Sequence, residues 1–317
     1  MQYRPLGKTG IRTPILSLGT GGPSLMGQKS NRSQSDQNAL VRYCLDNGIN
    51  LFDTAPIYLQ SEKILGKALK TVPRESYVLV TKWVPNNHTD IRKIADNPEL
   101  MIESINKSLK RLQTDYIDVM LFHGVMPEIY DLLVERFYET SAKLKETGKI
   151  RFLGLSTRIR DDLKQETALR ALELHNNLWD VIMVKYGILN QYASKKILPL
   201  ALRHNVGVIN MAAIRVKLHN PELLVNLVEQ WKKLGYIAEN SLSQTNPLDW
   251  LINKNVNSIA SAGYKFAADH PAISSVLTGT SSIKNLNNNI AALEQPYLRK
   301  SDSDRLKKLF GDIVEYA

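Results

Sequence analysis

Residues 48–53 read Gly-Ile-Asn-Leu-Phe-Asp, a short and mostly apolar run that ends in an acidic side chain. Two later runs have the same form: residues 77–81 (Tyr-Val-Leu-Val-Thr) are followed by Lys82, and residues 117–122 (Ile-Asp-Val-Met-Leu-Phe) are followed by His123. Short runs rich in β-branched and aromatic residues are typical of strands, and helix-like stretches lie between them. Strand–helix units that repeat along a chain predict a parallel β-sheet.

The same alternation extends over most of the chain. Eight strand–helix units are the number that closes into a (β/α)8 TIM barrel. The sequence therefore predicts an α/β fold of this kind, as one domain over residues 1–317. We expect strands near 15–19, 49–52, 77–81, 117–122, 150–155, 181–185, 206–210 and 273–277, and helices near 35–47, 61–70, 98–112, 128–147, 161–175, 190–204, 248–269 and 282–292.

Three segments depart from the strand–helix rhythm. Residues 3–14 predict a small β-hairpin with Lys8-Thr9-Gly10 as its turn, which would cap the bottom of the barrel. The polar loop 27–35 and the long segment 211–247, which has its own helix near 221–234, each follow the C-terminal end of a strand. We expect both to overhang the barrel mouth, and the polar middle of the long segment, 239–246, to offer little to a static core.

Composition excludes several classes of protein. The hydrophobic fraction of 43% and the charged fraction of 23% are those of an ordinary globular protein. Cys44 is the only cysteine, so an intramolecular disulfide and a cysteine-based zinc site are excluded, and its apolar surroundings predict a core residue. The N-terminus lacks the pattern of a signal peptide, and no stretch has the length and apolarity to cross a membrane, so we expect a cytoplasmic protein without a membrane partner.

The formal net charge of +10 comes from Lys and Arg spread over the helix-like stretches. No basic block is interleaved with aromatic residues as in a nucleic-acid platform, so solvated helix faces are favoured over polyanion binding. We expect no nucleic-acid partner and no strong oligomer, but a monomer or a weak homo-oligomer. A basic average can still steer an anionic cofactor toward the site.

Four side chains near strand ends predict one catalytic site: Asp53, Tyr58, Lys82 and His123. In a parallel barrel the C-terminal strand ends converge on one mouth, where active sites lie. A phenol is a poor acid or base at neutral pH, and an ammonium beside it lowers its pKa. We therefore expect Tyr58 to be the proton donor or acceptor, Lys82 to tune it, Asp53 to anchor the lysine, and His123 to orient the substrate oxygen and help to shuttle the proton.

Each of these four residues also has an ordinary structural interpretation. Tyr58 alone could be a loop aromatic, Asp53 and Lys82 a structural ion pair, and His123 a core histidine. Their joint placement at strand ends favours the catalytic interpretation. The other histidines lack such neighbours and are interpreted as surface or structural residues: His88, His175, His204, His219 and His270.

Several motifs, in order and at the same strand positions, resemble those of the aldo-keto reductases, over the region from the hairpin to about residue 292. Within that family the chain resembles the branch of plant L-galactose dehydrogenase and bacterial aldose 1-dehydrogenases, and residues 273–277 with Ser281-Ser282 are the clearest sign of it. The resemblance implies a (β/α)8 barrel that moves hydride between a nicotinamide cofactor and a carbonyl, with no metal. The motifs are Asp53-Thr54-Ala55-Pro56-Ile57-Tyr58 with residues 61–69, Thr81-Lys82, the strand ending at His123, residues 148–156 and residues 278–282.

The resemblance also implies positions for the cofactor. Ser156-Thr157 matches the usual Ser-Asn pair that holds the nicotinamide amide, and Gly19 with Thr20 lies beside the nicotinamide. Met183 stands where the family has a glutamine, and Met211 where an aromatic often stacks under the ring, which methionine can do softly. The usual Ser-Pro-Leu of the pyrophosphate loop is replaced by residues 212–214 (Ala-Ala-Ile), followed by Arg215, which could pair with the pyrophosphate.

At the adenosine end, Gly279-Thr280 opens a helix whose free N–H groups could hold phosphate. Relatives that prefer NADP carry Lys and Arg around this turn, whereas Gly279 and Asn285 stand at the aligned positions here and Asn289 is kept. The missing arginine favours NAD over NADP, with NADP still possible. Gly19, Gly21 and Gly22 lack the G-x-G-x-x-G spacing, so a Rossmann-type site is rejected.

Apolar residues near Tyr58 predict a substrate wall. Met26, Ile57 and Trp83, with Leu59 in place of a usual glycine, could stack on a sugar face or exclude water. The sequence thus predicts an NAD(P)-dependent oxidoreductase acting on a small-molecule carbonyl or alcohol, such as a sugar or related cyclic polyol. The alternatives are a general NADPH-dependent aldehyde or ketone reductase and a non-catalytic barrel that binds nicotinamide as a sensor or auxiliary subunit.

Overall fold

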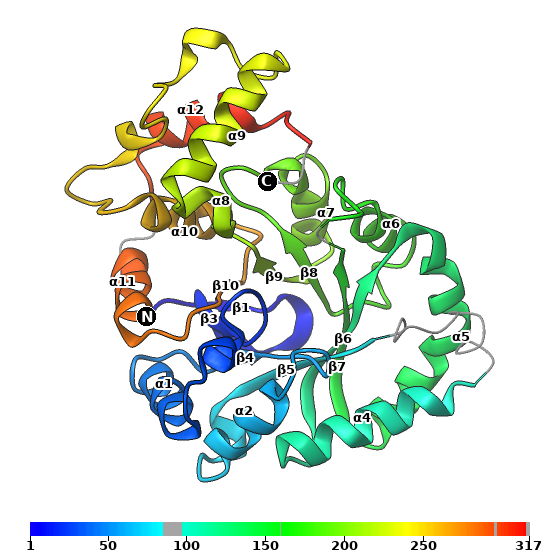
Figure 1. Cartoon of the computed structure of the whole chain (residues 1–317). Helices are drawn as coiled ribbons and strands as arrows, with labels where there is room; N and C mark the ends of the chain where they lie inside the picture. The colour runs from blue at the N-terminus through cyan, green and yellow to red at the C-terminus, as the bar shows by residue number, and fades with distance from the viewer. Residues whose placement is uncertain (85–96, 159, 295–296, 315–317) are drawn as a thin grey trace.

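Eight parallel strands form a closed barrel in the computed structural model, which describes residues 1–84, 97–158, 160–294 and 297–314. Neighbouring strands are hydrogen-bonded in the order β10-β3-β4-β5-β6-β7-β8-β9, so the chain runs once around the barrel and β10 closes it on β3 (Figure 1). The predicted (β/α)8 fold is confirmed. The strands are β3 (Leu16–Gly19), β4 (Leu51–Asp53), β5 (Val78–Trp83), β6 (Ile117–Val125), β7 (Ile150–Thr157), β8 (Val181–Lys185), β9 (Gly207–Met211) and β10 (Ser275–Thr278).

Side chains alternate between two cores along each strand. On β5, Val78 and Val80 belong to a cluster inside the barrel, whereas Leu79 and Trp83 belong to the larger cluster between the barrel and its helices. The period of two follows from the pleat of a strand. Lys82 occupies the last inward position of β5, at the C-terminal end of the strand. The alternation therefore decides which residues line the barrel mouth.

The N-terminal hairpin closes the bottom of the barrel. Strands β1 (Tyr3–Pro5) and β2 (Arg12–Pro14) pair antiparallel, and a short 3-10 turn, η1 (Gly7–Thr9), leads into Gly10 with a φ of 74°. Leu6 is fully buried in the inner barrel core, and the Lys8 amide donates to the Asn205 carbonyl at 2.7 Å. The predicted hairpin, its turn and its position are confirmed.

Helices surround the barrel, and most begin and end within two residues of the predicted ranges. Three begin later than predicted, at Glu166, Ile197 and Ile259 instead of 161, 190 and 248. The Asp162 carboxylate accepts from the amides of Glu166 (2.7 Å) and Thr167 (3.1 Å), which delays α6; the Ser258 hydroxyl caps α10 by accepting from the Ser261 amide at 3.0 Å. These helices are α1 (Gln34–Asp46), α2 (Ser61–Leu69), α4 (Glu99–Leu112), α5 (Pro127–Glu146), α6 (Glu166–Leu174), α7 (Ile197–Arg203), α10 (Ile259–Asp269) and α11 (Ile283–Glu294).

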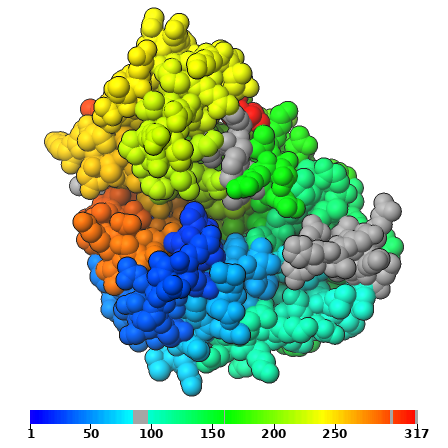
Figure 2. Space-filling view, viewed as in Figure 1, coloured from blue at the N-terminus to red at the C-terminus, as the bar shows by residue number. Residues whose placement is uncertain are grey.

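The segment after β9 forms a lobe that stands out from the helix ring, coloured yellow-green to yellow in Figure 2. It contains α8 (Arg215–His219) and α9 (Pro221–Lys233), and it packs against α12 (Lys300–Phe310), a helix that the sequence did not predict. The rings of Trp231 and Phe310 lie 5.6 Å apart, and both side chains are fully buried.

The middle of this lobe is better anchored than its polar sequence indicates. Leu242 is 6% exposed, and its carbonyl accepts from Lys232 Nζ at 3.1 Å. The expectation that residues 239–246 offer little to a static core is therefore wrong at Leu242, which belongs to the main hydrophobic core. Arg305 of α12 also donates to the carbonyl of the neighbouring Ser241 at 3.4 Å. The other predicted overhang, residues 27–35, overlaps η2 (Leu25–Ser30) and the start of α1. No helix in the described ranges is long and apolar enough to span a membrane.

Candidate active site

Asp53 and Lys82 form a buried ion pair at the barrel mouth. Lys82 Nζ lies 2.5 Å from Asp53 Oδ1 and donates a second hydrogen bond to the Thr54 carbonyl at 2.7 Å. Asp53 is 3% exposed and Lys82 is 1% exposed, so neither charge is screened by solvent. Adjacent strands β4 and β5 bring them together, because both residues occupy inward positions at the C-terminal ends.

Tyr58 lies over this ion pair. It follows β4 in the connection to α2, and Lys82 Nζ is 5.0 Å from the centroid of its ring. The backbone of Gly21 also passes close to this ring: a Cβ atom at residue 21 would lie 2.6 Å from two carbon atoms of the Tyr58 ring. Only glycine leaves room for the phenol at this position, a role that the sequence did not reveal.

His123 completes the predicted quartet. Its ring meets the ring of Tyr58 edge-on, with centroids 5.8 Å apart and an interplanar angle of 88°. Its Nδ1 atom is buried and has no hydrogen-bond partner among the residues that the structure describes. Burial, together with the positive charges of Lys82 and Arg158, lowers the pKa of His123 to about 3. A histidine that stays neutral near pH 7 can orient a substrate oxygen by hydrogen bonding, but it is poorly suited to the proton shuttle that the sequence predicted.

The pKa of Tyr58 differs from the expected direction. Burial raises the pKa of the phenol, and the nearby Lys82 ammonium opposes this rise without cancelling it. The lysine lowers the pKa of Tyr58, as predicted, but desolvation of the phenolate is the larger effect, so the net pKa lies above its ordinary value. For Lys82, burial on its own would lower the pKa, but Asp53 and Tyr58 outweigh it and the pKa is raised. The lysine thus keeps its charge beneath a protonated phenol.

Most of the residues predicted to contact the nicotinamide lie at the same barrel mouth. Gly19 is the last residue of β3 and Thr20 follows it, Ser156 and Thr157 end β7, and Met211 ends β9. Met183 lies one inward position below the end of β8 and is 2% exposed in the inner core.

Unsatisfied polar atoms gather around this mouth. The buried hydroxyls of Thr20 and Thr54 and the Nδ1 atom of His123 have no partner within the described residues. Buried polar groups normally have hydrogen-bond partners, so these atoms fit a polar ligand such as the ribose or amide of a nicotinamide cofactor.

The two residues expected to hold the nicotinamide amide already have protein partners. Ser156 Oγ accepts from the Gly124 amide at 2.9 Å, and Thr157 Oγ1 donates to Gln165 Oε1 at 3.2 Å. Gln165 also accepts from the amide of Lys185 at 2.7 Å and donates to its carbonyl at 2.9 Å. This glutamine, which the sequence reasoning missed, therefore ties the ends of β7 and β8 together.

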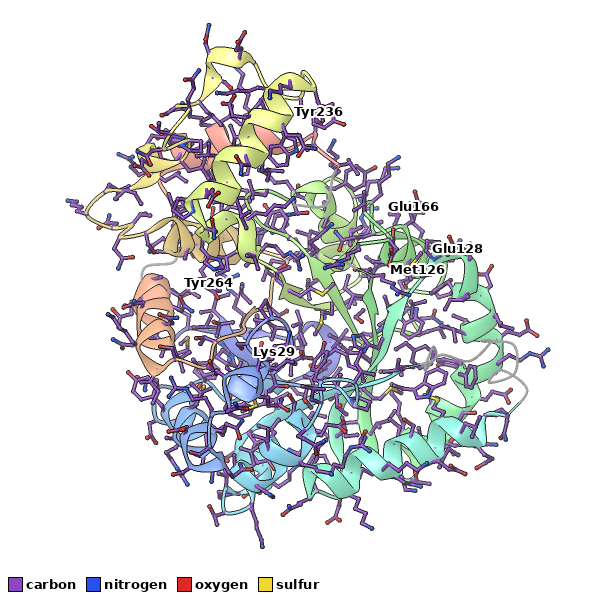
Figure 3. The ribbon with its side chains drawn as sticks, viewed as in Figure 1. Lys29, Met126, Glu128, Glu166, Tyr236 and Tyr264 are labelled. Carbon is purple, nitrogen blue, oxygen red and sulfur yellow. The ribbon has the colours of Figure 1, made fainter. Side chains whose placement is uncertain are left out.

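The residues predicted for the adenosine end follow β10. Gly279 and Asn285 are exposed, and Thr280 Oγ1 accepts from the Ser282 amide at 3.1 Å. Asn289 Nδ2 donates to Thr278 Oγ1 at 3.0 Å, and this hydroxyl also accepts from Tyr264, which Figure 3 labels on α10. Asn289 is thus held by the fold as well as being a candidate ligand.

Only some of the residues predicted to form the substrate wall lie at the barrel mouth. Ile57 is 49% exposed beside Tyr58, and Leu59 is 61% exposed with a strained φ of 53°. Trp83 lies one residue after Lys82 and so points outward; it is 2% exposed and packs on Phe137, with ring centroids 4.5 Å apart. Met26 is 1% exposed in the same outer core. The structure does not place Trp83 or Met26 on an open surface of the mouth.

One basic residue at the mouth was not singled out from the sequence. Lys185 ends β8 on the inward side, and the alternation of Val181, Met183 and Lys185 could have revealed it. The remaining histidines lie elsewhere: His175 Nδ1, for example, is 2.9 Å from the Tyr130 hydroxyl, and His88 is outside the described residues. No group of three or more His, Cys, Asp or Glu side chains that could hold a metal occurs in the part of the chain that the structure describes.

Comparison with known proteins agrees with this geometry. Residues 17–310 match the model of the aldo/keto reductase family. The chain is 28% identical to L-galactose dehydrogenase of Arabidopsis thaliana, over 98% of this chain and 93% of that protein. It is 29% identical to the NADH-specific methylglyoxal reductase of Escherichia coli (strain K12), over 96% of each.

A solved structure supports the same assignment. The holo form of an aldo-keto reductase from Bacillus halodurans superposes with a TM-score of 0.71 at 26% sequence identity, covering 100% of this chain and 97% of that one. The family match spans nearly the whole barrel and includes every strand that contributes to the mouth. This chain belongs to the aldo/keto reductase family and is an NAD(P)-dependent oxidoreductase.

Proposed function

We propose that this enzyme transfers hydride between NAD and the carbonyl or alcohol group of a sugar or a related cyclic polyol. The observation that carries the proposal is the buried Lys82–Asp53 pair beneath Tyr58, with the His123 ring nearly perpendicular to the same phenol ring. In carbonyl reduction the substrate oxygen must receive a proton, which a protonated phenol beside a charged lysine and a neutral imidazole can donate.

Each residue of the quartet has a distinct proposed role. Tyr58 would give the proton to the substrate oxygen or take it back, and a nicotinamide cofactor bound at the mouth would supply or accept the hydride. Lys82 stabilises the phenolate that remains after proton donation, and Asp53 holds the ammonium in place by the 2.5 Å contact. His123, neutral near pH 7, orients the substrate oxygen by a hydrogen bond.

The substrate class rests on similarity and on the residues beside Tyr58. The chain is similar to L-galactose dehydrogenase over nearly its whole length, and Ile57 and Leu59 offer exposed apolar surface that could stack on a sugar face. The similarity to a methylglyoxal reductase favours a second candidate, a reductase of small aldehydes and ketones. The predicted cytoplasmic location and the monomeric or weakly oligomeric state stay predictions.

The preference for NAD rests on the turn after β10. Gly279 and Asn285 are exposed there and bring no positive charge to a 2′-phosphate, and the bacterial relative at 29% identity is named as NADH-specific. We expect the dissociation constant for NADH, measured by fluorescence titration, to be no larger than that for NADPH. Tighter binding of NADPH by more than tenfold would contradict the preference.

The substrate assignment is tested by a panel of neutral aldoses, cyclic polyols and small aldehydes, followed at the NADH absorbance band. We expect the largest kcat/KM with a neutral aldose or cyclic polyol. A larger kcat/KM for short aldehydes, with aldoses inactive, would favour the second candidate. If the protein binds NADH but turns over none of these substrates, both proposed substrate classes are wrong.

A further inference from the structure

The side chain of Gln28 joins the loop after β3 to the connection that carries Tyr58. Its Nε2 atom donates to the Tyr58 carbonyl at 3.3 Å and to the Ser61 hydroxyl at 2.9 Å. Its Oε1 atom accepts from the Gln60 amide at 2.9 Å. One amide side chain from a different loop therefore spans the turn between the tyrosine and the start of α2.

The loop that carries Gln28 has an unusual backbone. Leu25 and Met26 have φ angles of 44° and 55°, in the left-handed region that non-glycine residues rarely adopt, and Gly27 follows with a φ of 81°. Met26 is 1% exposed, and its carbonyl accepts from Gln37 Nε2 at 3.2 Å. A strained backbone persists where its surroundings impose it, and strained segments are common at functional sites.

The connection around Tyr58 gains little support from apolar packing. Ile57 and Leu59, the residues on either side of the tyrosine, are 49% and 61% exposed, and Leu59 has a φ of 53°. The Ser61 amide closes the turn by donating to the Tyr58 carbonyl at 3.0 Å. Segments with few buried apolar contacts open most easily, so polar contacts such as those of Gln28 have a large effect on the order of this turn.

The structural alternative is that Gln28 only stabilises its own loop. Its hydrogen bond to the Leu25 carbonyl, at 2.8 Å, would be enough for that role. It does not account for the side-chain oxygen of Gln28 or for the two further acceptors of Nε2, which all belong to the connection of Tyr58. The glutamine is thus a link between two loops at the barrel mouth.

We propose that Gln28 is a positioning residue for the proton donor: it fixes the backbone of Tyr58 and so keeps the phenol over the Lys82 ammonium. The inference rests on the proposed function, because it takes Tyr58 as the group that moves the proton. Gln28 acts through Tyr58 and not on the substrate. A shift of the tyrosine backbone carries over to its hydroxyl, and a misplacement of about 1 Å can lower a rate by about 100-fold.

The test compares two glutamines that differ in what they hold. Gln28→Met keeps the side-chain length and removes the hydrogen bonds. The matched control is Gln34→Met, because Gln34 is also partly exposed and donates to the Asn38 side chain at 2.8 Å and to the Ile64 carbonyl of α2 at 3.2 Å. The two variants thus remove similar contacts to α2 and its approach, but only one of them removes contacts to the connection of Tyr58.

The first measurement is hydrogen exchange of the Gln60 amide, which does not depend on turnover. We expect Gln28→Met to speed this exchange by about tenfold or more, because the amide loses its acceptor, and Gln34→Met to leave it unchanged. Unchanged exchange in Gln28→Met, or the same increase in Gln34→Met, would refute the proposed link.

The second measurement is kcat with the best substrate, together with the dissociation constant for NADH. We expect kcat to fall by about 10- to 100-fold in Gln28→Met while NADH binding is retained. In a Tyr58→Phe background the same change should alter kcat by less than about twofold, because the group that Gln28 positions is already gone. Equal losses in both backgrounds, or a parent-like kcat in Gln28→Met, would refute the positioning role.

This inference and the proposed function fail separately. If the parent protein turns over no carbonyl or alcohol, the proposed function is wrong, and the exchange of the Gln60 amide alone decides whether Gln28 holds the connection. Normal turnover by the parent with a parent-like kcat in Gln28→Met contradicts the positioning role alone. If Gln28→Met does not fold, Gln28→Ala, which removes the same hydrogen bonds without adding an apolar side chain, is measured under the same criteria.

Discussion

Tyr58 lies close to a charged lysine and to the backbone of Gly21, and its proton is the one that the proposed chemistry moves. We expect Tyr58→Phe to lower kcat by about 10²–10⁴-fold, the usual contribution of a general acid–base group. The dissociation constant for NADH should change little, because only a hydroxyl is removed. Single-turnover rates with saturating cofactor provide the measurement.

A tyrosine far from the mouth serves as the control for that variant. Tyr43 bonds to Asn287 on the outer surface, and Tyr43→Phe should keep kcat near the parent value. If Tyr58→Phe reacts at the parent rate while chemistry is rate-limiting, the assignment of Tyr58 as proton donor is wrong.

Gly21 positions the phenol by leaving space for it. A methyl group in Gly21→Ala would lie 2.6 Å from the Tyr58 ring, so the ring or the loop must move. We expect kcat to fall at least tenfold, since a misplaced proton donor loses its alignment with the substrate. In a Tyr58→Phe background the same change should have much less effect on kcat, because the proton donor is already gone; equal, additive losses would argue against this coupling.

His123 makes the protein sensitive to acid. Its pKa is about 3 in the folded protein, against an ordinary value of 6.5, so the unfolded chain binds the additional proton between these values. Stability is therefore fully present above pH 6.5 and falls as the pH drops toward 3. We expect the loss in the free energy of unfolding between pH 7 and pH 4.5, measured by urea denaturation, to be smaller in His123→Asn than in the parent. An equal loss in both proteins would show that His123 is not the group responsible.

Helix α12 packs against a segment that lies far from it in the sequence. It covers α9 of the lobe after β9, where Phe310 packs against Trp231. We expect Phe310→Ala to lower the free energy of unfolding by about 3–5 kcal/mol, the usual cost of removing a buried aromatic ring, if unfolding is cooperative.

Hydrogen exchange separates a local from a global effect of that variant. Faster exchange confined to residues 221–242 would show that the lobe opens independently of the barrel. Uniformly faster exchange over the strands would indicate that the lobe and the barrel unfold as one unit, and unchanged exchange everywhere would contradict the anchoring role of α12.

Strands were predicted more accurately than helix starts, and the reason is local chemistry. The strand at 181–185 was predicted at its observed limits because its apolar run is bounded by polar residues and turns. The start of α10 was predicted about ten residues early, since residues 248–258 are held by a 3-10 turn, η6 (Asp249–Leu251), and by the pairing of Asn253 with Val256. Such side-chain and turn contacts leave little trace in apolar periodicity. Helix α12 was missed because its partner surface is formed by the distant α9.

At the scale of the whole molecule, the barrel made the quartet predictable. Residues that follow apolar strands converge at one end of a parallel barrel, so Asp53, Lys82 and His123 could be placed together without coordinates. The same rule, extended by the alternation of side chains, predicts that Lys185 points inward and Trp83 outward. The role of Gly21 could not be predicted, because it depends on a backbone approach between two separate connections.

The closure of the barrel also constrains how the chain is made. Ser17 on β3 meets Ser275 on β10, 258 residues later, and the hairpin docks through Lys8 onto Asn205, just before β9. During synthesis from the N-terminus, the surface that receives the hairpin emerges only after about two thirds of the chain, and the last strand later still. Until then one edge of β3 is unpaired, and the hairpin has not yet covered the bottom of the inner barrel core. The nascent chain is therefore exposed to edge-to-edge association for most of its synthesis. Contacts of such long range slow folding, and they tie completion of the active-site mouth to arrival of the last strand.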